Sequence, residues 1–413
     1  MNTPTPRPAP QPIPVVRFLD RTTPPHIATL VLMSGLSAMS MNIFLPSLPA
    51  MARSFDAPYQ LMQLSVSLYL ALSAVLQLVI GPLSDRYGRR PVLLTCCGLF
   101  LLATVGTLIA PTAEIFLLFR MLQAVIAAGL LLSRTVVRDM VPDAQAASMI
   151  GYVTMGMSLV PMVSPIIGGA LDEAFGWRAN FVLLFVLGGL VTALAWADLG
   201  ETARRTQTSL RDQVRQYPAL LRSYRFWGYA VTAASASGAF FSFLGGAPYV
   251  GSVIYGMSPA TLGYHFAAPA VGYLTGNFIS GRLSMRVGIV RMVLAGGLVL
   301  FGGILILLVL TLAGVRHPML FFGMMTAIGI GNGLTMPNAN AGMMSVRPDL
   351  AGTASGLGGA LMVAGGAALA TLAGVVLQWG TTELPLVILM FCTSLISLGA
   401  TLVVIRRNRQ LGL

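Results

Sequence analysis

The stretch Gly81-Pro82-Leu83-Ser84-Asp85-Arg86-Tyr87-Gly88-Arg89-Arg90-Pro91 decides how this chain is interpreted. It concentrates charge between two long apolar segments, as expected of a tight loop at a membrane surface. Its glycines permit a sharp turn and close backbone approach. A similar stretch, Gly281-Arg282-Leu283-Ser284-Met285-Arg286-Val287-Gly288, repeats Gly, Leu, Ser, Arg and Gly in register. The duplication indicates a membrane protein of two parallel repeats, an arrangement known among transporters.

The composition agrees with a membrane protein. Hydrophobic residues make up 56% of the 413, charged residues only 9%, and the mean hydropathy is +0.80. About a quarter of the residues in a soluble domain are charged. The net charge of +12 has no basic face with interleaved aromatics, so nucleic-acid binding is not expected. The three cysteines fall inside apolar spans and form no metal or disulfide pattern.

Twelve apolar segments each approach the ~20 residues that cross a bilayer. They lie at about 28–50, 60–82, 92–111, 115–136, 147–170, 179–198, 226–250, 261–284, 290–313, 319–342, 351–378 and 385–405. We therefore predict an all-α polytopic membrane protein with twelve transmembrane helices in two six-helix repeats. The predicted organisation is a disordered cytoplasmic tail (1–25), an N-terminal six-helix bundle (26–200), a cytoplasmic linker (201–225), a C-terminal six-helix bundle (226–405) and a cytoplasmic tail (406–413).

The arginines predict the orientation. All the basic residues are Arg, and with the N-terminus inside, 21 of them lie on the cytoplasmic side. Arg53, Arg178 and Arg316 lie on the outer side, and Arg120 lies within a span. Basic residues favour the cytoplasmic side. We expect both termini in the cytoplasm and the chain in a bacterial inner membrane.

The stretch at 81–91 resembles the loop signature of the major facilitator superfamily, G-x-L-x-D-R-x-G-R-[RK]. The end of the first span, Met41 to Pro49, resembles helix 1 of the bicyclomycin/chloramphenicol-resistance (Bcr/CflA) drug exporters, M-D-x-Y-L-P-x-x-P. The resemblance extends from about residue 30 to 405. It implies the facilitator fold and a multidrug or antibiotic exporter driven by a proton gradient, without a cofactor.

The resemblance implies gating roles for the charged residues of this loop. In the superfamily its Asp faces the N-terminus of helix 11 and braces the two halves in the outward-facing state. Asp85 suits this role, because a carboxylate is stabilised at the positive end of a helix. Arg86 and Arg89 are placed to pair with Asp139, at the cytoplasmic end of the fourth span. The alternative is a positive topology anchor, for which Asp85 would be superfluous.

Arg120 and Gln123 lie in the fourth span, where Arg120-Met121-Leu122-Gln123-Ala124 resembles the signature R-x-x-Q-G with Ala124 in place of Gly. The resemblance implies proton coupling and cavity shaping for Arg120, since a buried Arg marks a functional site or a partner. Its alternative is that Arg120 extends to the outer interface.

The fifth span resembles the helix-5 signature of antiporters, which ends G-P-x-x-G-G, with Ser164 in place of the first of those glycines. Prolines kink a helix and glycines permit close packing. The resemblance favours export over import, and packing alone is the alternative. The residues concerned are Gly156, Pro161, Pro165, Gly168 and Gly169.

Asn42 departs from the branch, whose helix 1 has an acid at this position. Asn cannot titrate, so proton handling cannot transfer to it, and none of the 13 acids lies near the middle of a predicted span. His265 is one candidate for the coupling proton, since His titrates near neutral pH. Asp85 and Asp139, exposed alternately by gating, are equally eligible, and a purely interfacial His265 is the alternative to its coupling role.

A cavity between the halves is expected to bind substrate. Amides and aromatics without charge suit an amphipathic, largely uncharged ligand of drug size, although each is equally suited to a helix–helix contact. The candidate residues are Asn42, Tyr69, Gln77, Gln123, Phe240, Phe241, Tyr249, Tyr273, Asn277, Asn332 and Asn338.

Three functions remain open at this point. The first is a proton-coupled drug exporter for neutral or zwitterionic antibiotics. The second is a dedicated exporter of one endogenous metabolite, and the third is an uncoupled facilitator or sensor of the same fold. No nucleophile–base pair, metal set or phosphate loop suggests an enzyme. The expected partners are a small molecule, protons and the lipid bilayer, and we expect a monomer.

Overall fold

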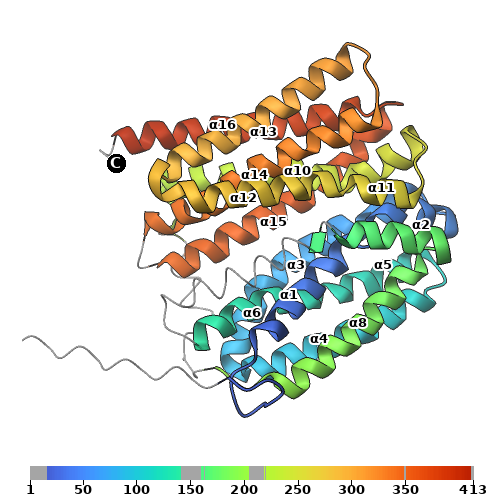
Figure 1. The fold of residues 1–413 in the computed structure, drawn as a ribbon, viewed down its shortest axis with the longest axis vertical. Helices are drawn as coiled ribbons and strands as arrows, with labels where there is room; N and C mark the ends of the chain where they lie inside the picture. The colour runs from blue at the N-terminus through green and yellow to red at the C-terminus, as the bar shows by residue number, and fades with distance from the viewer. Residues whose placement is uncertain are drawn as a thin grey trace, which may run out of the picture.

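The computed structural model describes residues 16–140, 160–161, 163–203, 218, 220–347 and 350–410, with the backbone alone for residues 138, 351 and 352. The regular structure of these residues is helical. Two groups of helices lie side by side in Figure 1. The first group comprises α1 (Ile27–Asn42), α2 (Leu48–Ser54), α3 (Tyr59–Tyr87), α4 (Arg89–Ile109), α5 (Ala113–Leu122), α6 (Ala127–Met140) and α8 (Arg178–Asp198). The second comprises α10 (Tyr224–Tyr249), α11 (Pro259–His265), α12 (Ala267–Val287), α13 (Ile289–Leu312), α14 (Pro318–Val346), α15 (Ala351–Val376) and α16 (Leu384–Gln410).

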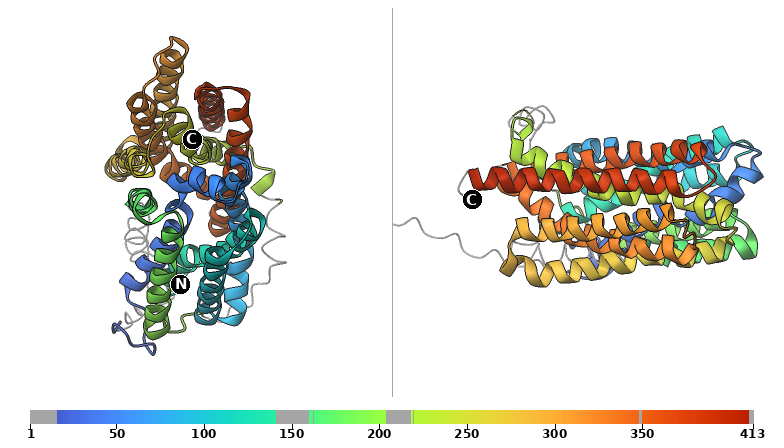
Figure 2. Two further views of the ribbon diagram at one scale, coloured as in Figure 1. Left: turned by 90° about the vertical axis from the view of Figure 1, so that its right-hand side faces the viewer. Right: turned by 90° about the horizontal axis from the view of Figure 1, so that it is seen from above.

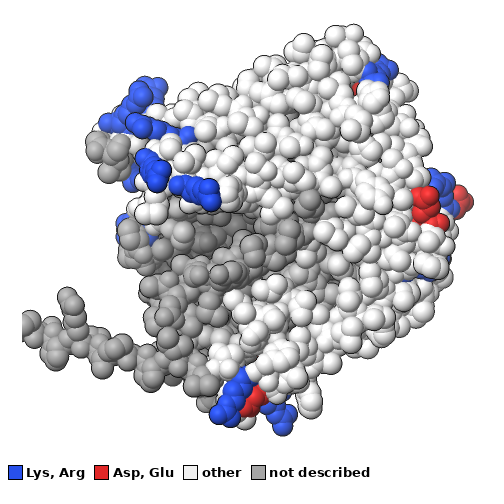
Figure 3. All heavy atoms as spheres, in the orientation of Figure 1, with Lys and Arg blue, Asp and Glu red and all other residues white. Residues whose placement is uncertain are grey.

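The axes of the long helices are roughly aligned with one another, as the two views in Figure 2 show. Ten helical segments of the described chain are long and apolar enough to cross a membrane. The other two predicted spans correspond to α11 with α12, and to a fifth span of which residues 163–175 are described as helical. Charged side chains gather near the ends of the helices and leave a broad uncharged surface between them (Figure 3). This distribution suits a bilayer-facing surface.

The prediction of a loop at 81–91 is wrong, because this stretch is almost entirely helical. α3 continues to Tyr87 and α4 begins at Arg89, so that Gly88 alone makes the turn. Gly88 has φ +102°, and its N–H donates to the carbonyl of Ser84. Gly288 makes the same turn between α12 and α13 with φ +89°, and its N–H donates to Ser284. The duplicated sequence thus forms a duplicated turn that requires a residue without a side chain.

Two predicted spans of the first bundle are interrupted, as the eighth is between α11 and α12. The first divides into α1 and α2 around a single 3₁₀ turn, Leu45–Ser47, where Pro46 and Pro49 lack the N–H that an α-helix needs. The fourth divides into α5 and α6 around the 3₁₀ turn Gln123–Ile126. Both interruptions lie close to buried polar side chains of the site described below.

Part of the predicted disordered tail is held on the protein. The carboxylate of Asp198, at the end of α8, is fully buried and accepts hydrogen bonds from the backbone N–H groups of Leu19 and His26 and from the hydroxyl of Thr29. The guanidinium of Arg21 lies over the ring of Trp196. Residues 16–26 therefore form a strap across the end of α8. At the other terminus, α16 continues to Gln410, so the predicted tail begins inside a helix.

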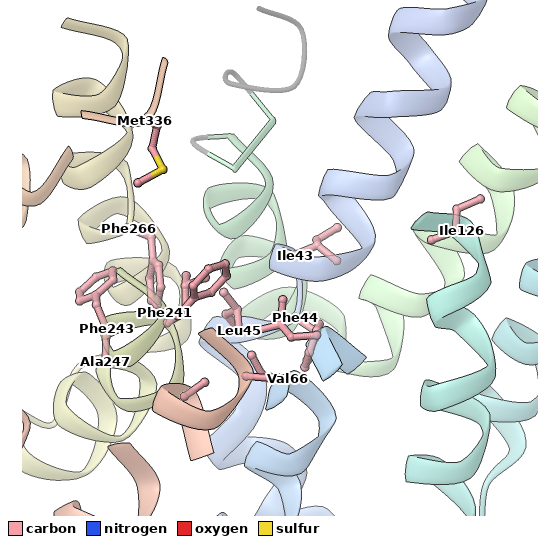
Figure 4. Packing of buried hydrophobic residues seen from close by; sticks show 14 of the residues in the cluster. Ile43, Phe44, Leu45, Val66, Ile126, Phe241, Phe243, Ala247, Phe266 and Met336 are labelled. Carbon is pink, nitrogen blue, oxygen red and sulfur yellow. The ribbon is translucent and has the colours of Figure 1, made fainter. Parts of the chain in front are cut away.

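The two bundles meet at the end opposite Gly88, which we name the Tyr59 end. Tyr59 donates a hydrogen bond to the carbonyl of Gly245, and Gln63 donates to that of Ala370. The carboxylate of Glu173 accepts from Ser258 and from the N–H of Ala260. Apolar side chains continue the contact, and Figure 4 shows Phe241 and Phe266 beside the interruption that carries Leu45. The Tyr59 end is thus sealed by both polar and apolar contacts.

Candidate functional site

A cavity of about 340 Å³ lies between the two bundles. Side chains of α1, α3 and α6 line it on one side, and those of α10, α12, α14 and α15 on the other. Along each helix the lining residues recur at helical spacing, such as Ala127, Leu130 and Arg134 on α6. Its walls are mostly apolar and aromatic, with a few polar groups, as in sites for small amphipathic ligands.

Seven of the predicted substrate-binding residues line this cavity: Asn42, Tyr69, Gln77, Phe240, Phe241, Tyr273 and Asn332. Asn332 is buried, and its Oδ1 has no hydrogen-bond partner in the part of the chain that is described. A buried amide without a partner costs free energy. That oxygen has almost no accessible surface, so a molecule in the cavity could bond to it only after the side chain rotates.

Asn42 uses one of its polar groups inside its own helix. Its side chain is buried, and Nδ2 donates to the carbonyl of Ala38 at 2.8 Å. An ionised carboxylate at this position would have no proton to donate. The amide therefore makes a hydrogen bond to its own helix that an ionised carboxylate could not make.

The other four predicted substrate-binding residues are used elsewhere. Tyr249 packs against Tyr59 in the seal, with ring centroids 5.1 Å apart. Asn277 donates to the carbonyl of Tyr273, and Asn338 donates to Ser280 and to the carbonyl of Leu334. Gln123 belongs to the Arg120 network. Tyr249, Asn338 and Gln123 make contacts between helices, which is the alternative that sequence reasoning had left open, whereas Asn277 bonds within its own helix.

Arg120 is completely buried at the junction of α5 and the following 3₁₀ turn. Its guanidinium lies between two rings, 4.0 Å from the centroid of Tyr69 and 4.5 Å from that of Phe44. Nη2 donates to the carbonyl of Ser40 at 2.8 Å, and Nη1 donates to Oε1 of Gln123 at 2.9 Å. The alternative that Arg120 extends to the outer interface is wrong, because no part of the side chain is exposed.

The Arg120 charge is balanced by rings and dipoles. The ion pairs within the described residues join Arg89 to acids and leave Arg120 without a carboxylate. Gln123 in turn donates to Thr104, which donates to the carbonyl of Phe100. Because Tyr69 contacts Arg120 and also lines the cavity, one side chain separates the buried charge from the cavity.

A second polar cluster surrounds the Gly88 turn. Arg89 forms ion pairs with Asp85 and with Asp139, the latter at 3.0 Å, and also donates to Ser84. Arg86 does not join this cluster and lies over the ring of Tyr87. The expected pairing with Asp139 is thus made by Arg89, which ties α3, α4 and α6 together.

Glu201 completes this cluster and was missed by sequence reasoning. Its carboxylate accepts from the N–H groups of Arg89 and Arg90, at the start of α4. These N–H groups have no partner within the helix, and a carboxylate there is favoured by the helix dipole. A carboxylate immediately after an apolar span was the available signal, but the sequence does not say which helix it caps.

Helix-5 residues pack on both sides of the interface. A Cβ at Gly168 would overlap the carbonyl of Ile43, and one at Gly169 would overlap that of Pro259 in the other bundle. Pro161 lines the cavity, and Gly263 of α11 lies against the backbone of Pro165. Gly156 lies outside the described residues. The close approach explains the small residues without assigning them a direction of transport.

His265 lies at the Tyr59 end of the second bundle, outside the cavity lining. Nδ1 is 2.8 Å from the carbonyl of Thr261, and the ring meets Phe322 edge-on at 5.0 Å. Both contacts fit the interfacial alternative.

Several cavity residues were not predicted, and Arg134 is the most consequential. It is exposed to the cavity from α6, although its place near the end of a span had suggested a cytoplasmic topology signal. Uncharged lining residues such as Met336, Met362 and Phe266 were also missed. An apolar residue facing a cavity carries the same sequence signal as one facing a neighbouring helix.

The fold and the site define a multi-pass α-helical membrane protein with a central cavity between two repeated bundles. The sequence profile of the Major Facilitator Superfamily matches residues 30–371. The chain belongs to this superfamily of transporters.

Its relatives include bacterial drug-resistance proteins. The chloramphenicol resistance protein of Pseudomonas aeruginosa is 30% identical over 344 residues, which cover 81% of this chain and 82% of the relative. Multidrug resistance protein D of Escherichia coli is 28% identical, covering 86% and 90%. The uncharacterized MFS-type transporter YdgK of Bacillus subtilis is 30% identical, covering 87% and 90%. The predicted resemblance to the Bcr/CflA branch is confirmed.

A solved structure shows the same fold at lower sequence identity. The bacterial homologue of the human lysosomal transporter Spinster, in an inward-facing and occupied conformation, aligns with a TM-score of 0.71 and 16% identity. The alignment covers 93% of this chain and 96% of that one.

Proposed function

We propose that the protein exports drug-like small molecules, neutral or zwitterionic, across the bacterial inner membrane by alternating access and proton antiport. The observation that carries this proposal is the cavity between the bundles, which has aromatic walls and scattered amides and is sealed at the Tyr59 end. The drug-resistance names of its relatives favour an exporter of antibiotics over a carrier of one metabolite.

Both termini are proposed to be cytoplasmic, so that the Tyr59 end faces outward. The seal then closes the outer side, and substrate enters from the cytoplasm. Moving the bundles apart would have to break the hydrogen bonds of Gln63, Tyr59 and Glu173, which are few enough to be remade in each cycle. The Gly88 cluster would contribute to the opposite seal when the inner side closes.

Proton coupling is proposed to pass through the Gly88 cluster. Asp85 and Asp139 share the single guanidinium of Arg89. Protonation of either acid would weaken its ion pair and free α3 or α6 to move. Asp85 would then be available to the N-terminus of α15, which is helix 11 of the predicted topology. His265 remains the alternative proton carrier, and loss of the pH dependence of efflux in His265→Ala would select it.

Asn42 provides a test of substrate choice. We expect wild-type cells to export a neutral amphenicol in preference to ethidium, because the described lining residues include no acid that would attract a lipophilic cation. Asn42→Asp is expected to broaden export toward ethidium. The measurement is paired efflux of both compounds from one efflux-deficient strain that expresses equal amounts of each variant. Wild-type export of ethidium as fast as the amphenicol would contradict the proposed preference, and export of neither compound would contradict the proposed function.

A further inference from the structure

One charged side chain faces the cavity from α6. Arg134 lies on the same face of α6 as Ala127 and Leu130, and all three line the cavity. The side chain of Arg134 is exposed. Arg134 also has an interaction within the protein. Its guanidinium carries five N–H donors, so that a contact in the protein and a contact to a ligand are compatible.

The charge of the cavity is positive as far as the described residues define it. The described lining includes Arg134 and no Asp or Glu, and helix 1 contributes the neutral Asn42. Arg120 adds a second positive charge behind Tyr69. Charges interact more strongly beside apolar walls than in water. A lipophilic cation is therefore disfavoured here, and an anionic group is favoured.

Other groups of the same cavity lining suit an amphipathic anion. Tyr273 of α12 and Gln77 of α3 offer hydrogen-bond donors. The guanidinium fork matches the two oxygens of a carboxylate. Phe240 and Phe241 supply the apolar surface for the rest of the molecule.

We propose that Arg134 is the counter-ion for the carboxylate of an amphipathic weak acid or of a zwitterion. This inference rests on the proposed function, because it takes the cavity to be the transport site. It predicts that, among molecules with similar aromatic or aliphatic bodies, those that carry an anionic group bind more tightly than neutral ones. The positive charge gives selectivity, and the uncharged walls give tolerance of different bodies.

The test is binding of two fluorescent probes to the purified full-length protein. Dansylglycine carries a carboxylate, and its methyl ester has the same body without the charge. We expect wild type to bind the acid about tenfold more tightly than the ester, as one charge-assisted hydrogen bond supports. Arg134→Gln is expected to bring the two affinities together by weakening the acid alone. Arg134→Lys is expected to restore part of the preference.

The matched control is Arg282→Gln, which also removes one positive charge. Arg282 is exposed on α12 and lies over the ring of Phe278, outside the cavity lining. It should leave the preference unchanged. Unchanged ester binding by Arg134→Gln would show that the variant is folded. Equal binding of acid and ester by wild type, or an undiminished preference in Arg134→Gln, would overturn the inference.

Efflux of a neutral amphenicol, measured with the same variants, separates this inference from the function on which it rests. Amphenicol export together with equal binding of the two probes would refute the role of Arg134 alone. A probe preference that depends on Arg134, with no export of any compound, would support the anion site and refute the exporter.

Discussion

At the scale of single residues, Arg120 is the most demanding feature of the structure. Its guanidinium is fully buried and has no carboxylate partner among the described residues, which is costly. Stacking between Phe44 and Tyr69 offsets part of that cost by about 1 to 2 kcal/mol per ring. Because burial of Arg120 is costly and the residue lies next to the cavity, we expect Arg120 to act in transport.

We therefore expect Arg120→Ala to abolish efflux, because it removes the charge and leaves Gln123 and the carbonyl of Ser40 without their donor. Arg120→Lys should restore only part of the activity, because an ammonium keeps the charge but loses the planar fork that stacks and bonds at once. The measurement is amphenicol efflux at matched expression. Arg282→Gln again controls for the loss of a positive charge. Full activity of Arg120→Ala would limit this network to a structural role.

Sequence reasoning found residues that are unusual for their surroundings. Arg120 stood out because a charge within an apolar span needs a partner, and Asn42 because it replaces an acid. Arg134 was missed for a physical reason. Near the end of a span, a topology signal and a cavity-facing charge look alike, and only the rotation of α6 distinguishes them. The pairing of Glu201 with the start of α4 depends on a long-range contact that no local pattern encodes.

At the scale of secondary-structure elements, the two Gly turns are the most informative. Apolar length predicted where the long helices lie, but it could not show that α3 and α4 are joined through Gly88 alone. The interruptions of the first and fourth spans were also not predicted. Prolines explain the first, whereas Gln123 carries no local signal that would end a helix.

Substitution of the two turn glycines separates backbone strain from steric overlap. Ala at either position must adopt a positive φ with ψ near 150°, a conformation almost restricted to Gly that costs about 1 to 3 kcal/mol. At Gly88 the added methyl would also meet the carboxylate of Glu201, whereas at Gly288 nothing lies within 4 Å. Gly88→Ala should therefore lower the apparent Tm of the purified protein more than Gly288→Ala does.

Gly81→Ala provides the control for these variants, since Gly81 lies inside α3 with open space around it. It is expected to change the apparent Tm little. Equal losses at Gly88 and Gly288 would show that Glu201 moves aside, and that its contact with the start of α4 contributes little to stability.

At the scale of the whole molecule, two similar bundles enclose a cavity and touch at one end. The repeat and the fold were predictable, because the duplicated stretches and the lengths of the apolar segments can be recognised directly in the sequence. The conformation was not, because the state that is sealed at the Tyr59 end depends on contacts between residues hundreds of positions apart, such as Gln63 and Ala370. The ion pairs of Arg89 are expected to matter in the opposite state, so Asp85→Asn should affect transport more than stability.

The most direct test of the central claim is transport by the purified protein in proteoliposomes with an imposed pH gradient. We predict that a neutral amphenicol moves against its own gradient as protons move the other way, and that collapsing the gradient stops it. Asp85→Asn should impair this movement at normal insertion, because it removes one of the two acids that share Arg89. Amphenicol flux that only equilibrates the compound, and is the same with and without the pH gradient, would contradict proton-driven export.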